Sequence, residues 1–481
     1  MLKNKKFALY AIAFNILGIV FMFMYSGLQN DQVNIIETYS GWTNNLAQLP
    51  ITVGNFVCIA LTFVFGTWFM KYGVRKTLIP CIMACALGCI GIIAANGLAL
   101  YSPAGLVNGL AIYKAGEVGC YWLYFVSLFV IRCACMCFQM AGFQLAANWF
   151  IKYRGRVMGI ITLGSPLFSV VGTSVMTQLI TTHWGGDYRF FYFGICIILV
   201  LIAVLTRFLL KDRPEEAGLY PDGADHAPLS EAGQDDEIHL TVKQVLSEKR
   251  AWLLIVSYGA FQFIINCCMG SMAVRYISLG GPEVWFGALK WLSVGAIGGI
   301  FMSYVFGWID DKFGTIIASY ALGVTELIPV LMLMFMPMGG CAWMEVLWGF
   351  GVACMTGGVP TMHPCSITYG YGRREYQSAN RIIMAIQLVP SAFAASMMVA
   401  LISAGKATLA YGICVVVIVI GLAAIFMMRN MKDANAADRD FIGTEDEEAR
   451  AELEAAAAEA APVEAAPVEA APVEAAVEAA E

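Results

Sequence analysis

The amino-acid sequence predicts an all-α membrane protein with twelve transmembrane helices, arranged as two six-helix pseudo-repeats. Of its 481 residues, 59% are hydrophobic and 13% are charged, whereas soluble domains contain about 45–50% and about 25%. Runs of about 20 apolar residues recur along the chain, and each is long enough to cross a hydrocarbon core of about 30 Å. A short motif of glycines and charges also occurs twice, 241 residues apart.

The apolar runs divide the chain into four segments. The predicted spans begin at about residues 8, 49, 77, 121, 157 and 189, and then at about 251, 285, 315, 342, 380 and 407. We therefore predict an N-terminal six-helix half over 1–210, a linker over 211–250, a C-terminal six-helix half over 251–430 and an acidic low-complexity tail over 431–481. The tail has too few large apolar side chains to form a core, so we expect a short charged helix followed by disorder.

The repeated motif lies between the second and third predicted spans of each half. Its first copy contains Gly66, Lys71, Gly73 and Arg75, and its second contains Gly307, Asp311, Lys312 and Gly314. A glycine, four residues, a lysine, one residue and another glycine predict a tight, charged turn that holds two helix ends together at the membrane surface. A duplicated six-helix unit with such gating turns is typical of a transporter that rocks one half against the other.

The distribution of charge predicts the orientation. One set of loops carries Lys3, Lys5, Lys6, Lys71, Arg75, Lys76, Lys152, Arg154, Arg156, Lys211, Arg213, Lys243, Lys249, Arg250, Lys312, Arg373 and Arg374. The opposite set has only scattered bases, so both termini are predicted to face the cytoplasm, in the plasma membrane of the cell. The formal net charge is −6, but residues 433–481 hold fifteen acids and two bases, which leaves +7 for the body. No basic amphipathic stretch indicates nucleic-acid binding, and the lipid bilayer is the expected environment.

These features resemble the major facilitator superfamily over nearly the whole chain, to about residue 430. Within it, the linker sequence from Lys211 to Gly223 (KDRPEEAGLYPDG) is similar to that of the oxalate/formate antiporter and monocarboxylate transporter branch. Asn148-Trp149-Phe150, with the Arg154-Gly155 and Met158-Gly159 pairs that follow, is similar to the same branch after its fourth span. The resemblance implies a carrier of small or medium organic anions that works by alternating access, with protons or a counter-anion as the coupled species. We expect a monomer.

Two positions depart from that branch. The first loop motif has Met70 where the superfamily places an aspartate, whereas the second keeps Asp311. The eleventh span, from about residue 380 to 403, has no lysine, whereas oxalate carriers of this branch use cationic residues in central spans. Oxalate is therefore disfavoured as the cargo, and we expect a cargo that is larger and more hydrophobic than oxalate.

Arg132 is the main candidate for substrate binding. It lies about eleven residues into the fourth predicted span, and Gln139 follows on its face. A charge inside a span is costly and is a functional candidate by default, and a planar fork of donors suits a carboxylate. In the resembling family the fourth span lines the cavity. The alternative is an arginine satisfied by backbone carbonyls or by a neighbouring helix.

Further polar residues in the spans are candidates for the same cavity. Lys290 supplies a second positive charge, or alternatively extends to the lipid headgroups. The others lie on polar stripes of the first, seventh and eleventh spans: Asn15, Tyr258, Gln262, Asn266 and Gln387. The alternative for each is a role in holding helices together.

Glu326 and His363 are the candidates for proton coupling. Glu326 lies in the middle of the ninth span, where burial raises the pKa of a carboxyl group, and His363 lies in the tenth span and titrates near neutral pH when exposed. The alternatives are a structural acid in an outer support helix and a hydrogen-bonded packing histidine.

The predicted function is secondary active transport of an organic anion, a monocarboxylate, by proton symport or anion exchange. No phosphate loop, nucleophile triad or metal-ligand cluster occurs in the sequence, so we expect neither an enzyme nor a cofactor. Three alternatives stay open. They are an importer of larger hydrophobic carboxylates such as bile acids or aromatic acids, a proton-coupled drug exporter, and a non-transporting membrane sensor that uses its acidic tail.

Overall fold

Long apolar segments form helices because an α-helix satisfies its own backbone hydrogen bonds, as a bilayer requires. The computed structural model describes residues 5–28, 44–100, 106–107, 110–111, 118–168, 189–224, 240–436 and 438, with isolated positions at 172, 175 and 179. The chain up to residue 210 contains α1 (Lys5–Gly27), α3 (Asn44–Tyr72), α4 (Val74–Leu100), α5 (Val118–Trp149), α6 (Arg154–Thr162), α7 (Gly164–Leu167) and α9 (Arg189–Leu209). The chain from residue 240 onward contains α10 (Val242–Ser247), α11 (Lys249–Gly280), α12 (Pro282–Phe313), α13 (Thr315–Phe335), α14 (Ala342–Ser403) and α15 (Ala407–Met428).

The prediction of a helical membrane fold is confirmed. Within the described residues, 10 helices are long and apolar enough to cross a membrane. One of them, α14, has 62 residues and contains a turn at Gly372 (φ 66°), so it supplies two spans. The fifth predicted span is described at its start, as α6 and α7. Two strands of two residues each, β1 (Leu106–Val107) and β2 (Leu110–Ala111), pair antiparallel between α4 and α5.

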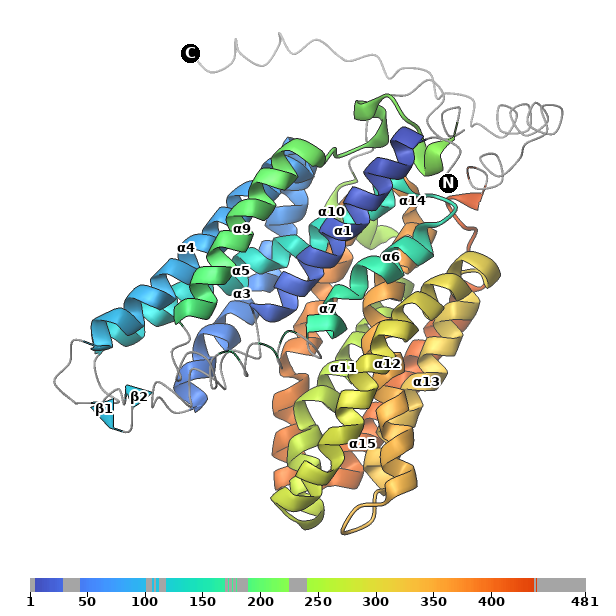
Figure 1. Cartoon of the computed structure of the whole chain (residues 1–481). Coiled ribbons are helices and arrows are strands. Elements are labelled where there is room, and N and C mark those ends of the chain that lie inside the picture. The colour runs from blue at the N-terminus through green and yellow to red at the C-terminus, as the bar shows by residue number, and fades with distance from the viewer. Residues whose placement is uncertain are drawn as a thin grey trace, which may run out of the picture.

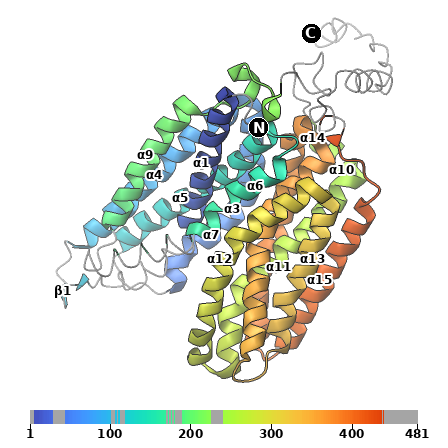
Figure 2. The same cartoon turned by 45° about the vertical axis from the view of Figure 1, so that its right-hand side comes forward.

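The helices form two bundles, one built from α1 to α9 and one from α11 to α15 (Figure 1). The bundles lie together at the end that carries the N-terminus, the linker and the end of α15, here called the linker side, and they diverge toward the opposite end (Figures 1 and 2). Large apolar side chains on the outer helices are exposed, including Phe193, Leu201 and Phe208 of α9. An exposed apolar surface of this kind is the face expected to meet lipid.

Both loop motifs form the predicted tight turns. A single residue separates α3 from α4 and α12 from α13, and these residues are Gly73 (φ 84°) and Gly314 (φ 89°). A positive φ of this size is accessible to glycine at little cost and strained for other residues. The last glycine of the motif is therefore explained in both halves by the backbone conformation of the turn.

Two aspartates of the linker signature cap backbone N–H groups of the first bundle. Asp212 Oδ1 accepts a hydrogen bond from the N–H of Arg75 in the first turn of α4, at 2.8 Å. Asp222 Oδ2 accepts from the N–H groups of Ile151 and Lys152, at 2.8 and 2.7 Å, just after α5. Burial raises the pKa of both carboxyl groups, against these hydrogen bonds, which lower it. The linker signature is thus a scaffold that fixes two helix ends.

The Asn148-Trp149-Phe150 motif at the end of α5 contacts the linker signature, the sequence from Lys211 to Gly223. The side-chain amide of Asn148 donates to the carbonyl of Asp212 at 3.0 Å, and the indole N–H of Trp149 donates to the carbonyl of Lys211 at 3.1 Å. The ring of Phe7 packs against Trp149 with centroids 6.0 Å apart. These contacts join the beginning of α1, the end of α5 and the linker.

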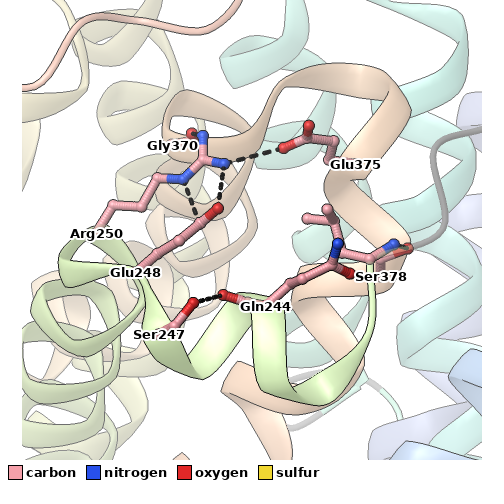
Figure 3. Close-up of polar contacts among 8 residues, drawn as sticks. Gln244, Ser247, Glu248, Arg250, Gly370, Glu375 and Ser378 are labelled. Carbon is pink, nitrogen blue, oxygen red and sulfur yellow. Dashed lines mark hydrogen bonds and ion pairs between the residues drawn. The ribbon is translucent and has the colours of Figure 1, made fainter. Parts of the chain in front are cut away.

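The linker also binds the second bundle. Arg373 Nη2 donates to both carboxylate oxygens of Glu215, at 2.9 and 3.1 Å. Figure 3 shows a second group of charges beside the turn of α14, where Arg250 lies between Glu248 and Glu375 and donates to the carbonyl of Gly370 at 2.9 Å. The hydrogen bond from Arg250 lowers the pKa of Glu248. These ion pairs hold the start of α11 against the turn inside α14.

Candidate functional site

Arg132 lies on α5 and its guanidinium reaches α3. Its Nε donates to Asn55 Oδ1 at 2.6 Å. Gly54 allows this approach, because a methyl group there would lie 2.7 Å from Arg132 Cγ. The Nη1 nitrogen is buried and has no hydrogen-bond partner among the described residues. A buried donor without a partner is costly unless something binds it, so this nitrogen marks a place for an acceptor.

Two of the other candidate amides, Asn15 and Asn266, bond within their own helices. Asn15 donates to the carbonyl of Ala11, and its Oδ1 is buried without a partner in the described part of the chain. Asn266 donates to the carbonyl of Gln262 at 2.9 Å. Gln139 is half-buried on α5. Among the described residues, no hydrogen bond joins these amides to Arg132, so the structure does not bring the predicted set together at one point.

Tyr258, His363 and Gln387 form a polar group inside the second bundle. The Tyr258 hydroxyl bonds to that of Ser319, and its ring lies 6.1 Å from the His363 ring. His363 Nε2 bonds to Gln387 Oε1 at 2.6 Å, and the Gln387 amide donates to the carbonyl of Leu254 at 2.9 Å. All three side chains are buried. The group links α11, α13 and both parts of α14.

Lys290 and Glu326 lie in different surroundings. Lys290 is exposed on α12, and its ammonium lies 5.5 Å from the ring centre of Trp291. Glu326 is completely buried in α13, and neither carboxyl oxygen has a partner within the described residues. An ionised carboxylate in that position would be very costly, so the neutral acid is the form that fits.

Asp311 joins the two bundles on the linker side. Its carboxylate accepts from the N–H of Gly155 at 2.8 Å and from the N–H of Arg156 at 3.1 Å, and it pairs with the Arg156 side chain at 3.4 Å. These N–H groups belong to the first turn of α6, where backbone donors lack intrahelical partners and negative charge is favoured. The aspartate of one bundle therefore caps a helix of the other.

Glycines let α6 and α12 approach closely beside this cap. A methyl group on Gly155 would lie 2.5 Å from the carbonyl oxygen of Gly307, and a methyl group on Gly159 would lie 2.5 Å from that of Ser303. A β-carbon on Gly307 would overlap the carbonyl of Gly155. Deeper along the same pair of bundles, the hydroxyls of Thr162 and Thr361 share a hydrogen bond of 2.7 Å.

The first loop motif makes the corresponding contact with α14. Arg381 donates to the hydroxyl of Thr67 at 2.8 Å, and Gln377 donates to the carbonyl of Gly66 at 3.3 Å. A β-carbon on Gly66 would overlap Arg381, so the glycine is needed for this packing. Met70 Sδ lies 3.3 Å from the Ser378 hydroxyl. Met70 thus meets a hydroxyl, whereas Asp311, at the same place in the second motif, caps a helix.

The motif lysines and the remaining motif arginine lie at the edge of these contacts. Lys71 lies over the ring of Tyr72, and Lys312 lies over the ring of Trp308 at 4.9 Å. Arg75 donates through its side chain to the carbonyl of Leu210 at 3.4 Å. Among the predicted gating residues, Gly66, Gly307 and Asp311 make the described contacts that join the two bundles directly.

The sequence interpretation missed two residues that the structure brings forward. Asn55 holds the guanidinium of Arg132, and Arg381 holds Thr67 across the two bundles. Asn55 precedes the apolar middle of α3 and lies in no polar stripe. The signal available in the sequence was therefore only that a polar residue lies inside a predicted span. Arg381 is an intramembrane charge near the start of the eleventh predicted span, and the rule that singled out Arg132 also applies to it.

The comparisons with known proteins agree on one fold. The proton:xylose symporter XylE bound to 6-bromo-6-deoxy-D-glucose has a TM-score of 0.63 at 14% identity, with 88% of this chain and 95% of that chain covered. The transporter FucP in an outward conformation has a TM-score of 0.63 at 16% identity, over 88% and 100%. A bacterial homologue of the iron transporter ferroportin, in an outward-facing state, has a TM-score of 0.65 at 10% identity, over 87% and 99%.

The family is shown by the sequence itself. A search of curated protein sequences gave no match. The sequence profile of the Major Facilitator Superfamily matches residues 7–372, which is most of the chain. The chain therefore belongs to the Major Facilitator Superfamily and is a multi-pass membrane protein of secondary transport, not an enzyme.

Proposed function

We propose that the protein moves an organic monocarboxylate across the plasma membrane by alternating access, coupled to protons or to a counter-anion. The observation that carries this proposal is Arg132, a guanidinium inside the membrane-spanning part with a buried Nη1 that has no partner among the described residues. A carboxylate would supply two acceptors in the planar geometry that a guanidinium matches. A neutral cargo would leave the positive charge uncompensated.

The arrangement of the bundles supports an outward-facing state. The contacts made by Asp311, Gly307 and Arg381 join the bundles on the linker side, and the bundles diverge toward the other end (Figure 2). With the linker side placed in the cytoplasm, as the basic loops predict, the cytoplasmic gate is the closed one. Two of the similar solved structures, FucP and the ferroportin homologue, are described as outward.

Proton coupling would require a group that changes its protonation during the cycle. Glu326 fits the neutral form in the described state because it is buried without a partner. His363 is bound to Gln387 between two parts of α14. Both side chains stay candidates, and both lie in the second bundle, whereas Arg132 lies in the first.

Uptake of labelled lactate, pyruvate, benzoate and cholate into proteoliposomes tests the proposed function. Under an inward proton gradient, symport predicts uptake that a proton ionophore abolishes. Anion exchange predicts uptake that ignores the gradient and appears when the vesicles are preloaded with a second anion. Movement of benzoate or cholate but not lactate would identify a larger hydrophobic carboxylate as the cargo. If none of the four moves in either format, the organic-anion assignment is wrong.

A further inference from the structure

We propose that Asn55 is the positioning residue for Arg132, and that it selects which edge of the guanidinium meets the substrate. This inference rests on the proposed function. An arginine has donors on Nε, Nη1 and Nη2. Asn55 Oδ1 occupies Nε at 2.6 Å, so the Nη1–Nη2 edge is left for a two-point contact with a carboxylate. The buried Nη1, which has no hydrogen-bond partner in the described part of the chain, lies on that edge.

The chemistry of the asparagine supports the same assignment. An aspartate at this place would accept the same hydrogen bond but would also cancel the charge of Arg132, as a permanent internal anion. A neutral amide oxygen orients the side chain and leaves its full positive charge for an anionic cargo. Gly54 completes the arrangement, since a methyl group there would lie 3.1 Å from Arg132 Cβ and 2.7 Å from its Cγ.

The test compares Asn55→Ala and Asn55→Asp with the wild type, using the carboxylate that the wild type moves in the panel above. Asn55→Ala is expected to raise KM by about tenfold or more with a smaller change in kcat, because the hydrogen bond that orients the Arg132 guanidinium toward the substrate is lost. Asn55→Asp is expected to be worse than Asn55→Ala, although it has nearly the same shape. A residue that only fills space would show the opposite order.

Coupling to Arg132 gives the second readout. In an Arg132→Lys background, which has no Nε–H in this position, Asn55→Ala should add little further loss, because interacting residues are not additive. Thr62→Val is the matched control, since Thr62 is buried on α3 and donates only to the carbonyl of Cys58 in its own helix. Wild-type kinetics in both Asn55 variants would overturn the positioning role while transport by the wild type still stood. A wild type that moves no carboxylate would overturn both.

A second inference concerns residues 431–436 and 438, here called the C-terminal strap, which follow α15. The Tyr369 hydroxyl donates to the carbonyl of Met431 at 2.8 Å, and the N–H of Ala434 donates to the carbonyl of Tyr369 at 2.9 Å. The amide of Asn435 donates to the carbonyl of Thr368 at 2.8 Å. Asn435 and Asp438 are buried. The strap is therefore packed on the turn of α14.

The part of α14 that the strap covers also meets the linker and the first bundle. Arg373, next to the Gly372 turn, donates to Glu215 of the linker, and Cys365 Sγ lies 3.4 Å from Met158 Sδ of α6. We infer that the strap is a third component of the linker-side gate, beside the two loop motifs. It stabilises the closed gate and has to shift when the bundles separate there.

Two truncations separate the strap from the tail. Removal of residues 440–481 should leave transport unchanged, whereas removal of 431–481 should loosen the gate. Cys365, buried 3.4 Å from Met158 of the other bundle, is the reporter. Its alkylation by a water-soluble maleimide, followed by mass spectrometry, should be several-fold faster in the longer truncation.

Asn435→Ala guards against an effect of misfolding in that truncation. It keeps the strap and removes the hydrogen bond from the Asn435 amide to the carbonyl of Thr368, so it should also speed alkylation of Cys365, by a smaller factor. Equal alkylation rates in the wild type, in Asn435→Ala and in the 431–481 truncation would overturn the role of the strap.

Discussion

Arg132→Gln is expected to abolish carboxylate uptake while the protein still inserts and folds. Glutamine keeps polar atoms beside Asn55 but removes the charge and the fork of donors that would bind the cargo. Truncating one partner of a buried, hydrogen-bonded charge pair costs about 2–5 kcal/mol, which corresponds to a loss of about 30-fold to several thousandfold in kcat/KM. Uptake into proteoliposomes, with reconstituted protein measured in parallel, is the assay.

Two observations give this prediction its controls. Arg132→Lys keeps the charge and loses the planar fork, so it should retain some transport with a raised KM. Lys290→Gln is the second comparison, because Lys290 is exposed and its ammonium lies over its neighbour Trp291. A raised KM is expected if Lys290 binds the substrate, and an unchanged KM if it extends to the lipid headgroups. If Arg132→Gln transports at the wild-type rate, Arg132 does not hold the substrate, and the proposal of an anionic cargo loses its main support.

Gly307→Val should have the second-largest effect, because it removes the closed form of the linker-side gate. A β-carbon on Gly307 overlaps the carbonyl of Gly155 in the other bundle. Backbone atoms cannot move aside as the end of a flexible side chain can. Overpacking of this kind typically destabilises the packed state by about 1–3 kcal/mol or more. We expect the population to shift toward states open on the linker side, with faster alkylation of Cys365 and a loss of at least about tenfold in uptake.

The matched control lies on the same helix. A β-carbon on Gly287 of α12 would meet nothing within 4 Å, so Gly287→Val should behave as the wild type in both assays. Slow alkylation of Cys365 in Gly307→Val, equal to that of Gly287→Val, would show that the two bundles do not need this close approach.

The fold was predictable because its signals are local. Spans of about 20 apolar residues and the glycines of both motifs follow from bilayer thickness and from backbone sterics. Gly73 and Gly314 have the positive φ values that a one-residue turn between helices requires. The turn at Gly372 within α14 is of the same kind, and the predicted break between the tenth and eleventh spans lies close to it.

The candidate site was less predictable because it depends on contacts between distant helices. Arg132 was found from its charge, but its partner Asn55 lies 77 positions away, and no spacing rule connects them. Tyr258 shares a helical stripe with Gln262 and Asn266, yet its hydroxyl bonds to Ser319 inside the second bundle. A stripe gives the face of a helix, and only tertiary packing decides whether that face meets a cavity or another helix.

The same reasoning limits what the linker signature says about cargo. Asp212 and Asp222 cap helix ends, Glu215 pairs with Arg373, and the carbonyl of Lys211 accepts from Trp149. Every one of these contacts is made on the linker side. Chains grouped by this signature are therefore grouped by how they anchor their linker-side scaffold. A classification by cargo would have to compare the residues that surround Arg132 and Asn55 instead, and two transporters with identical linkers are free to carry different anions.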